Sequence, residues 1–452
     1  MIVKNQLLAL HCERLGAEME GVCFYEGQTV FVPGALPGED IETRATLVKK
    51  RYAFARLEHI VSPSAERVEP PCPHYRLCGG CAAQHMTYAL TLAQKRAQIE
   101  DCLTRIGGFS LPQGFVPPVL GAESPYHSRN KTSLPVAGTW DAPQIGFYRR
   151  RSHQVVPISD CPIAMPGLPP ILGCVADWMR QAHVDPYCEE TGKGLLRHVV
   201  VRRARSGDAL VLLAATSEHL PDAPYLWQLL TQRASGVRGL HVTLNRRRDN
   251  VILGDTSRRL FGEETITETL LGLDFEIAPL SFFQVNPAQT ERLYQQALDF
   301  AELRPGDICV DAYAGAGTIA LCMARSAARV IGIEIVPQAI EAARRNAERN
   351  GLRNADFLVG AVEQELPRLV AEGLRPDVVV LDPPRKGIEP PVIKAVLAAK
   401  PRRVVYVSCH VPSQARDLAL LRDGGYRLTR CQGVDLFCYA DGVENVALLE
   451  RA

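Results

Sequence analysis

The sequence is poor in aromatic residues and lacks a long apolar run near its N-terminus: Phe, Trp and Tyr make up 6% of its 452 residues, and the longest such run is Leu7–Leu10. That run is too short for a signal-peptide core or a membrane span, so we expect a cytoplasmic protein without a membrane segment. No internal repeat or low-complexity tract is found, and a composition of 46% hydrophobic and 22% charged residues excludes a disordered chain. Because 452 residues exceed what one hydrophobic core organises, two or three domains are expected.

Net charge is also nearly absent, at +1, but the charges are unevenly distributed. Between Tyr126 and Leu260 the chain has 18 Lys+Arg against 11 Asp+Glu, whereas the remainder has 33 against 39. This middle region contains three basic runs, Arg149-Arg150-Arg151, Arg202-Arg203-Ala204-Arg205 and Arg246-Arg247-Arg248. A single run is often only a solvated face, but three in one region favour a polyanionic partner such as RNA or DNA.

Composition divides the chain into three parts. Residues 1–61 alternate short apolar and polar stretches with Gly or Pro, which predicts a small antiparallel β-barrel, and the Pro-rich Ser62–Pro71 is interpreted as a linker. Residues 72–270 begin with a Cys-rich segment and continue with mixed strand-like and helical patterns, which predicts a central α+β domain. Residues 281–452 alternate strands and helices, which is typical of a mostly parallel, doubly wound α/β sheet.

Within this C-terminal part, Asn286-Pro287 has the pattern of a helix start, a capping side chain followed by proline. A second helix is expected over Pro337–Asn350, ending at Gly351. The expected strands are Ile308–Ala312, Val330–Glu334, Asp356–Val359, Val378–Leu381 and Arg403–Ser408.

The turn after the first of these strands is rich in glycine. Gly315 and Gly317 let the backbone approach a ligand, and the next helix offers free N–H groups. The third glycine of a dinucleotide motif is missing, which argues against NAD. Glu334 closes the next strand, where its carboxylate can accept hydrogen bonds from ribose hydroxyls. Together these features indicate a nucleotide-type site.

Two other strands of the same sheet end in chemically reactive groups. Asp382 is followed by two prolines, and Cys409 follows the strand Arg403–Ser408. Alone, the first would be compatible with a structural turn and the second with a packed thiol. Because ligands bind beyond the carboxyl ends of parallel strands, both residues are expected beside the cofactor.

The order of these motifs resembles a class I S-adenosylmethionine (SAM) methyltransferase. The motifs also resemble, more specifically, those of the RNA (uracil-5-)methyltransferase family, and they cover residues 281–451 densely. They are Ser281–Pro287, Leu381–Gly387, Val407-Ser408-Cys409 with Ala415-Arg416-Asp417, and Gly442-Val443-Glu444.

The resemblance implies a role for each matching residue. Carbon 5 of uracil is too weak a nucleophile to take a methyl group unaided, so Cys409 would add to carbon 6 and Glu444 would later remove the carbon 5 proton. The residues that match SAM-binding positions of the family are Gln284, Tyr313, Glu334 and Asp382. For Gln284, capping of the helix that begins at Pro287 is the alternative role.

The sequence departs from the family pattern in two places. After the nucleophile the family commonly has Asn-Pro, where this chain has His410-Val411. Before the base it commonly has His-Val, where this chain has Gly442-Val443. The Cys and the Glu are retained, so the chemistry is expected to be retained too.

The Cys-rich segment has the spacing C-x5-C-x2-C, formed by Cys72, Cys78 and Cys81. A tetrahedral or cubane site needs a fourth ligand, for which Cys161 is the candidate. Residue chemistry leaves zinc and iron–sulfur open, since His74 or His85 could complete a Cys3His zinc site. The resemblance implies a [4Fe-4S] cluster on the four cysteines, as in a subset of the family. Radical-SAM chemistry is excluded because its spacing is C-x3-C-x2-C.

Residues 1–61 resemble the TRAM domain, an RNA-binding barrel of the same subset, although the first sixty residues hold seven Lys+Arg against eight Asp+Glu. The combination with the cluster is more similar to enzymes that form 5-methyluridine in 23S ribosomal RNA than to enzymes of the tRNA T-loop. The expected partner is therefore RNA with a flipped-out uridine, and the expected protein is a monomer. Alternatives are a tRNA uracil-5-methyltransferase, a methyltransferase for an exocyclic amine, and a non-catalytic RNA-binding factor.

Overall fold

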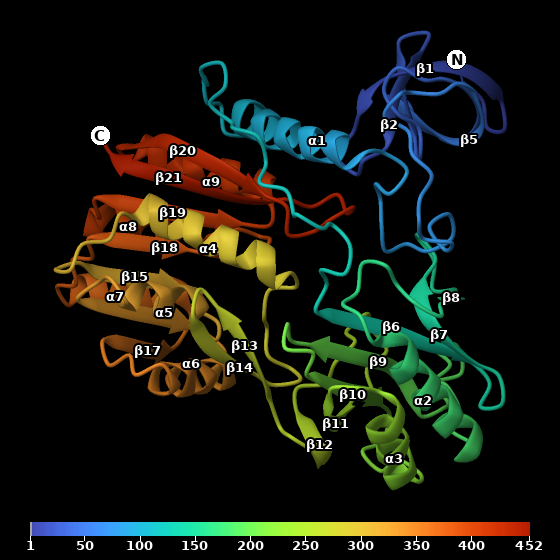
Figure 1. The fold of residues 1–452 in the computed structure, drawn as a ribbon. Coiled ribbons are helices and arrows are strands. Elements are labelled where there is room, and N and C mark those ends of the chain that lie inside the picture. Colours follow the sequence, from blue (N-terminus) through green and yellow to red (C-terminus); the bar gives the residue numbers. More distant parts are fainter. Residues whose placement is uncertain (1) are drawn as a thin grey trace.

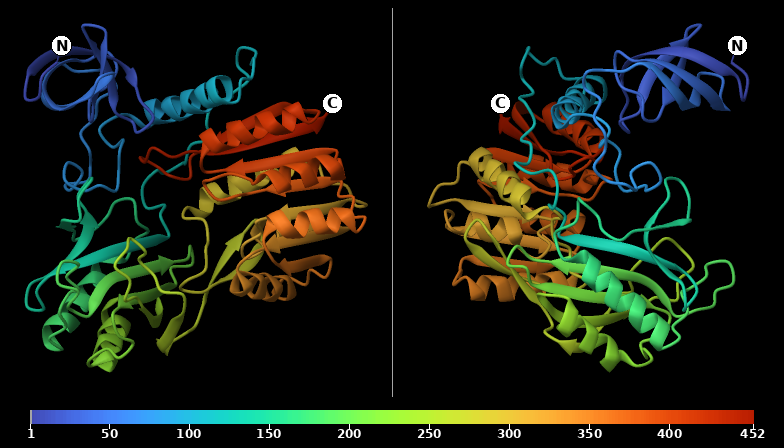
Figure 2. Two further views of the ribbon diagram at one scale, coloured as in Figure 1. Left: turned by 180° about the vertical axis from the view of Figure 1, so that it is seen from behind. Right: turned by 45° about the vertical axis from the view of Figure 1, so that its right-hand side comes forward.

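The computed structural model describes residues 2–452, which form a small barrel and two large sheets (Figure 1). In Figure 1 the blue barrel lies at the top, the green central sheet at the lower right and the orange and red C-terminal sheet at the left. Figure 2 shows the same units from two further directions, with helix α1 (Tyr88–Asp101) next to the red end of the C-terminal sheet.

The N-terminal strands close into the expected barrel. Alternate residues point inward, so that in β1 Leu8, Leu10 and Cys12 are buried while their neighbours are exposed. The prediction of a small N-terminal barrel is confirmed. Its strands are β1 (Leu7–Leu15), β2 (Gly21–Tyr25), β3 (Gln28–Val32), β4 (Asp40–Val48) and β5 (Tyr52–Ser62), closed in the order β1-β2-β3-β5-β4. The expectation of a wholly antiparallel barrel is wrong, because β3 and β5 pair in parallel.

The central sheet has seven strands and two helices on one face. Helices α2 (Leu168–Gln181) and α3 (Ala223–Arg233) pack on the side chains of alternate strand residues, such as Val211 and Leu213. Leu210 points to the opposite face and joins the core of the C-terminal part. The strands are β6 (Lys131–Gly138), β7 (Pro143–Tyr148), β8 (Val155–Pro157), β9 (Leu196–Arg203), β10 (Ala209–Ala215), β11 (Val237–Leu244) and β12 (Ser257–Gly262), in the order β12-β11-β10-β9-β6-β7-β8.

The C-terminal sheet has seven strands in the order β17-β16-β15-β18-β19-β21-β20. Its first five strands are parallel, and β21 is antiparallel to both neighbours. All five strands expected from the sequence are confirmed. They are β15 (Ile308–Ala312), β16 (Arg329–Glu334), β17 (Ala355–Val359), β18 (Val378–Leu381) and β19 (Arg403–Ser408), followed by β20 (Tyr426–Val434) and β21 (Glu444–Arg451).

Helices cover both faces of this sheet, which produces two separate cores. One face carries α4 (Pro287–Ala301), α5 (Thr318–Ala324) and α6 (Pro337–Arg349), and α6 also packs against the hairpin of β13 (Ile266–Leu270) and β14 (Leu273–Ile277). The other face carries α7 (Val362–Ala371), α8 (Pro390–Ala399) and α9 (Val411–Asp423). The helix expected at Pro337 is confirmed.

Helix α1 and the π-helix η1 (Cys102–Ile106) pack on the C-terminal sheet rather than on the central one. Ile99 and Leu103 enter the core formed with α7, α8 and α9. A fully buried ion pair joins Lys95 Nζ to Asp435 Oδ1 at 2.5 Å, and Tyr88 donates a hydrogen bond to the other carboxylate oxygen at 2.7 Å. Asp435 follows β20, so this contact ties α1 to the connection that leads into β21.

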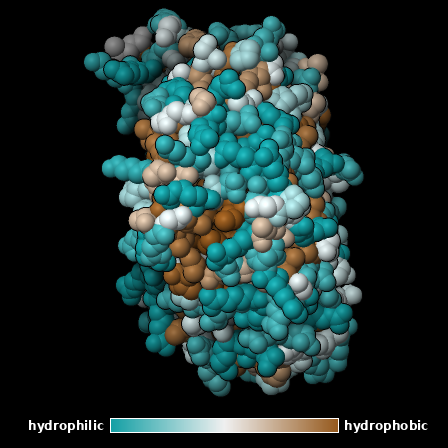
Figure 3. Space-filling view, turned by 90° about the vertical axis from the view of Figure 1, so that its left-hand side faces the viewer, coloured by the Kyte–Doolittle hydropathy of each residue, from teal (hydrophilic) through white to brown (hydrophobic). Residues whose placement is uncertain are grey.

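No helix within residues 2–452 is both long enough and apolar enough to cross a bilayer. The left-hand side of Figure 1 is shown face-on in Figure 3, where hydrophilic residues predominate and hydrophobic ones gather in a hollow near the middle.

Candidate active site

Acidic side chains gather where neighbouring parallel strands end. Asp311 is the last but one residue of β15, Glu334 ends β16 and Asp382 follows β18. The backbone N–H of Asp382 donates to the carbonyl of Ala312 at 3.3 Å, which holds the two strand ends together. The carboxyl edge of the sheet therefore brings together acids that are far apart in the sequence.

The glycine-rich turn lies on this edge and is held by Glu334. The Glu334 carboxylate accepts hydrogen bonds from the N–H groups of Gly315 at 3.1 Å and Val336 at 3.0 Å. Gly317 has φ +82, and a Cβ there would lie 3.0 Å from Phe357, so only glycine fits. A Cβ on Gly315 would meet nothing within 4 Å, so there is space beside the turn.

Cys409 and Glu444 lie at the same end of one strand pair. The antiparallel pair β19 and β21 places Ser408 opposite Asn445. Cys409 directly follows the last residue of β19, and Glu444 is the first residue of β21. The two side chains are close enough for the charge of Glu444 to raise the pKa of the Cys409 thiol.

Burial and mutual repulsion shape the electrostatics of this edge. Burial raises the pKa of Glu444 well above its usual value, and the charge of Asp382 raises it further. Burial also raises the pKa of Asp382 to about 7 and that of the Cys409 thiol to about 11, the latter opposed by Arg385. One Glu444 oxygen is buried without a hydrogen-bond partner among the described residues.

Asp311 is a further member of the site that sequence reasoning did not assign. Both of its carboxylate oxygens are buried without a regular hydrogen-bond partner in the described chain. Burial and the nearby charge of Asp382 raise its pKa well above the usual value, and only the backbone of Ala320 acts in the opposite direction. A buried, unpartnered carboxylate is costly, which indicates a place for a cationic ligand group. Its position at the end of a strand was the only signal in the sequence.

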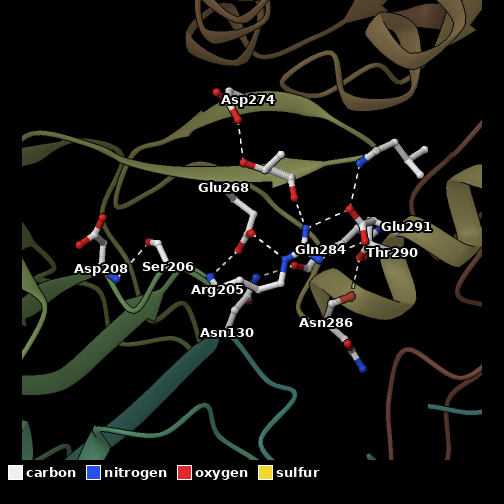
Figure 4. A network of polar contacts seen from close by, with 12 residues as sticks. Asn130, Arg205, Ser206, Asp208, Glu268, Asp274, Gln284, Asn286, Thr290 and Glu291 are labelled. Carbon is white, nitrogen blue, oxygen red and sulfur yellow. Dashed lines mark hydrogen bonds and ion pairs between the residues drawn. The ribbon is translucent and has the colours of Figure 1, made fainter. Parts of the chain in front are cut away.

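Gln284 lies between the central and C-terminal sheets. Its carbonyl accepts a hydrogen bond from Asn130 Nδ2 at 2.9 Å, as Figure 4 shows. The cap of α4 is Asn286, whose side chain accepts from the N–H of Gln289. The capping role considered for Gln284 therefore belongs to Asn286.

Two cations beside Gln284 were not assigned to the site from the sequence, although Arg202 belongs to the second basic run. Arg202 is 2% exposed and donates to the carbonyl of Ser281, but two of its nitrogens, Nε and Nη1, have no partner among residues 2–452. Lys131 is its register partner on β6, and burial together with Arg202 lowers the pKa of Lys131 to about 8.

The departure from the family pattern at His410 has a structural explanation. His410 is the N-cap of α9, and its Nδ1 accepts from the N–H of Ser413 at 3.4 Å. Burial lowers the pKa of this imidazole, which favours the neutral form that can accept. A histidine thus performs the capping that an asparagine can perform at the same position.

The predicted metal ligands Cys72, Cys78, Cys81 and Cys161 come close enough for their charges to interact. Burial raises the pKa of Cys81 to about 12. Within residues 2–452, however, no three His, Cys, Asp or Glu side chains adopt the arrangement of a metal site. His85 is engaged by the Tyr75 hydroxyl at 2.6 Å. The metal expectations are thus not confirmed, although the four thiols are neighbours.

The three basic runs differ in the contacts that their arginines make. In the second run Arg205 is bound by Glu268 and Glu291, each at 3.0 Å, as seen in Figure 4. In the third run Arg247 pairs with Asp249 at 2.6 Å. The first run borders a cavity of about 550 Å³.

The sheet order, the glycine turn held by an acid of the neighbouring strand, and the unpartnered carboxylate of Asp311 define a SAM-dependent methyltransferase. The residues present fit this cofactor, because SAM carries a sulfonium and an ammonium group and the edge offers carboxylates with space beside the turn.

Comparison with known proteins narrows this class. The family model of tRNA (Uracil-5-)-methyltransferase matches residues 257–452. Uncharacterized RNA methyltransferases of Listeria innocua and Clostridium acetobutylicum are 42% and 38% identical, over 99% and 100% of this chain and 98% of each relative. The crystal structure of a Pyrococcus abyssi tRNA (uracil-54, C5)-methyltransferase with S-adenosyl-L-homocysteine is similar with a TM-score of 0.79 and 28% identity, covering 98% of this chain and 100% of the other.

The chain belongs to the RNA (uracil-5-)methyltransferase family and is a SAM-dependent RNA methyltransferase. One expectation needs correction. Because the structure of a tRNA enzyme matches 98% of this chain, the N-terminal barrel does not separate rRNA enzymes from tRNA enzymes.

Proposed function

We propose that this enzyme forms 5-methyluridine in 23S ribosomal RNA through a covalent bond between Cys409 and carbon 6 of the target uracil. The observation that supports the proposal is the position of Cys409 and Glu444 at the same end of the pair β19 and β21, where the charges of Glu444 and Asp382 act on the Cys409 thiol. A nucleophile and a base at one end of the same strand pair suit a reaction that needs both in sequence.

The residues proposed to hold SAM are Gln284, Tyr313, Gly315, Gly317, Glu334 and Asp382. When bound, SAM supplies an electrophilic methyl group. Glu334 already orders the turn through its hydrogen bond to Gly315. The raised pKa of Asp382, about 7, leaves a substantial fraction of this side chain ionised near neutral pH, where it can attract the cationic part of the cofactor.

Cys409 and Glu444 then act in turn. The Cys409 thiol, whose pKa burial raises to about 11, releases its proton to solvent, and the thiolate adds its electron pair to carbon 6. Carbon 5 then becomes the nucleophile that would take the methyl group, whose bond to sulfur would break so that S-adenosyl-L-homocysteine leaves. The Glu444 carboxylate accepts the proton from carbon 5, the electrons of that C–H bond restore the carbon 5–carbon 6 double bond, and the thiolate leaves. The raised pKa of Glu444 makes it a stronger base than an exposed carboxylate.

A tRNA is the second candidate substrate, and the likeness to the Pyrococcus abyssi enzyme supports it. The resemblance of the Cys-rich segment to that of the rRNA subset supports 23S rRNA, whereas the barrel does not distinguish the two classes. Both RNAs present uridines in loops, where a base can be flipped out of its stack.

One experiment tests the proposal. Purified enzyme is incubated with SAM and unmodified transcripts of 23S rRNA and of tRNA in separate reactions, and the nucleosides are identified by mass spectrometry. We expect 5-methyluridine from the 23S transcript. Product from tRNA alone would support the second candidate, and an N-methylated base would contradict the role of Cys409.

We also propose a [4Fe-4S] cluster on Cys72, Cys78, Cys81 and Cys161. The neighbouring positions of the four thiols support it. Iron and sulfide content and the visible absorption of anaerobically purified protein test the assignment, with Cys81→Ser expected to lose both and Cys188→Ser, which changes an exposed thiol elsewhere, to retain both. Zinc in place of iron would support the alternative.

A further inference from the structure

The barrel has no excess of basic residues that could bind RNA, but basic residues from another part of the chain lie next to it. The turn after β7 carries the run Arg149-Arg150-Arg151. Arg151 lies over the ring of Phe54 in barrel strand β5, 5.3 Å from its centroid, and pairs with Glu18 of the barrel at 3.2 Å. Positive charge from the central part of the chain therefore borders the barrel.

Aromatic rings continue this surface across the barrel. Phe54 contacts Tyr52 with ring centroids 5.9 Å apart, and both contact Phe31. Tyr52 is 38% exposed, so part of its ring is available to a ligand. An exposed aromatic ring next to arginines is the combination with which proteins bind single-stranded nucleic acids, because bases stack on the rings and phosphates contact the cations.

The arginine turn also forms a cavity with the Cys-rich segment. The backbones of Cys78 and Arg149 form an isolated antiparallel β-bridge, and the N–H of Gly79 donates to the carbonyl of Tyr148 at 2.9 Å. This close approach favours glycine, since a Cβ on Gly79 would lie 3.0 Å from that carbonyl. The cavity is a depression open to solvent, with a volume of about 550 Å³. Its lining includes Gly79, Gly80, Tyr148, Arg149, Arg150 and His153.

The charges of this cavity lack acidic partners. Among residues 2–452 no carboxylate pairs with Arg149 or Arg150, and Arg150 donates only to the carbonyl of Cys81 at 3.4 Å. Both side chains are exposed. In the other two runs Arg205 and Arg247 are bound to acids, whereas Arg246 and Arg248 are exposed and have no paired carboxylate in the described chain. Arg149 and Arg150 differ from Arg246 and Arg248 because they line the cavity next to Arg151, which contacts the barrel.

We propose that these residues form a binding strip for a single-stranded segment of the substrate RNA, outside the catalytic centre. The strip consists of Tyr52, Phe54, Tyr148, Arg149, Arg150 and Arg151. Phosphates contact Arg149 and Arg150, one nucleotide occupies the cavity and a neighbouring base stacks on Tyr52. The proposal deepens the proposed function and rests on it only in taking RNA as the substrate.

Salt dependence of binding tests the cationic half of the strip. For Arg149→Gln/Arg150→Gln we expect the affinity for the 23S rRNA transcript to fall about tenfold at physiological salt. Filter binding over a range of salt should show the slope of log K against log salt reduced by about 1.4, since each contact to a single strand contributes about 0.7. The matched control is Arg259→Gln, which removes an exposed charge from strand β12 and should change neither quantity.

Stacking is tested separately with Tyr52→Leu. We expect the affinity to fall about 5- to 100-fold with an unchanged salt slope, because a stacked base contributes without releasing counterions. Circular dichroism checks that each variant is folded, and calorimetry should give unchanged SAM affinity for all of them.

Wild-type affinity and slope in the double arginine variant would overturn the proposal, as would equal losses in Arg259→Gln. Failure of the proposed function is distinguished by its own readout. If wild-type enzyme binds the transcript through the strip but forms no 5-methyluridine, the catalytic assignment fails and the strip stands.

Discussion

The carboxyl edge of the C-terminal sheet gathers buried acidic groups, whereas the strip on the barrel gathers exposed basic groups. The edge buries Asp311 and Glu444 with no cation bound to them in the described chain, whereas the strip exposes Arg149 and Arg150 with no acid bound to them. Each region leaves without a partner the kind of group that its ligand complements, a cationic cofactor at the edge and a polyanion at the strip. Where charge is only structural, as at Lys95 and Asp435, it is paired. A net charge of +1 conceals this division.

The largest effect is expected at the edge. Cys409→Ala should lower the turnover of 5-methyluridine formation by about 10⁴-fold or more, because the covalent step is lost while binding remains. Nucleoside mass spectrometry gives the rate, and filter binding should give unchanged RNA affinity. Cys188→Ala, at an exposed thiol, is the control and should retain full activity. Substantial turnover in Cys409→Ala would assign the chemistry to another group.

The buried ion pair of Lys95 and Asp435 gives the second test, which compares a paired charge with an unpaired one. Lys95→Met leaves Asp435 buried without its partner, so the free energy of unfolding should fall by about 3–5 kcal/mol. Arg149→Gln changes an exposed and unpaired charge, so its effect should stay within about 0.5 kcal/mol. Denaturant unfolding of both variants measures the difference. Equal stability would show that burial and pairing do not distinguish these charges.

Asp311 provides the third test. Asp311→Asn should raise the dissociation constant of SAM about 10- to 100-fold, since a hydrogen bond to a charged group is lost. Thermal unfolding of the free protein should not occur at a lower temperature, because an unpartnered buried carboxylate has been removed. Calorimetry and thermal melts measure the two quantities. A large loss of stability with unchanged SAM affinity would make Asp311 a structural residue.

The smallest effect is the pH dependence of Asp382. Burial raises its pKa to about 7, so the ionised fraction rises from about one tenth at pH 6 to about nine tenths at pH 8. SAM affinity should therefore rise about ninefold over this range in the wild type and much less in Asp382→Asn.

The pH dependence of the free energy of unfolding has the opposite sign to that of the SAM affinity. The folded wild type binds a proton on Asp382 that the unfolded chain has released above pH 4, so the wild type loses stability relative to Asp382→Asn as pH rises towards 7. Melting of both proteins between pH 5 and 8 measures this, and a difference that grows in favour of the wild type would contradict it.

Much of the edge was predictable from the sequence. Parallel strands with apolar runs and short turns fix their own positions, so Glu334, Asp382 and Cys409 could be placed at strand ends before the fold was known. The position of Cys409 and Glu444 at the same end of one strand pair could not be derived from spacing, because it depends on β21 inserting between β19 and β20. Asp311 was overlooked because its importance arises from burial without a partner.

The strip was much less predictable. The run Arg149–Arg151 was visible, but the sequence did not show that Arg151 reaches Phe54, nearly a hundred residues earlier. The placement of α1 was also hidden, because it is set by the long-range pair of Lys95 with Asp435. Local sequence patterns predict helices and strands, whereas contacts between distant turns depend on how the barrel, the central sheet and the C-terminal sheet pack together.

The most direct test of the account uses Glu444→Gln with SAM and the RNA that the wild type methylates. Without the base the methylated intermediate cannot lose its proton, so a covalent protein–RNA complex should accumulate while product formation falls about 10²- to 10⁴-fold. Denaturing electrophoresis detects the complex, and mass spectrometry of the digested protein should locate it on Cys409. Normal turnover, or a slowed reaction without any covalent complex, would contradict the central claim that Cys409 and Glu444 act as nucleophile and base.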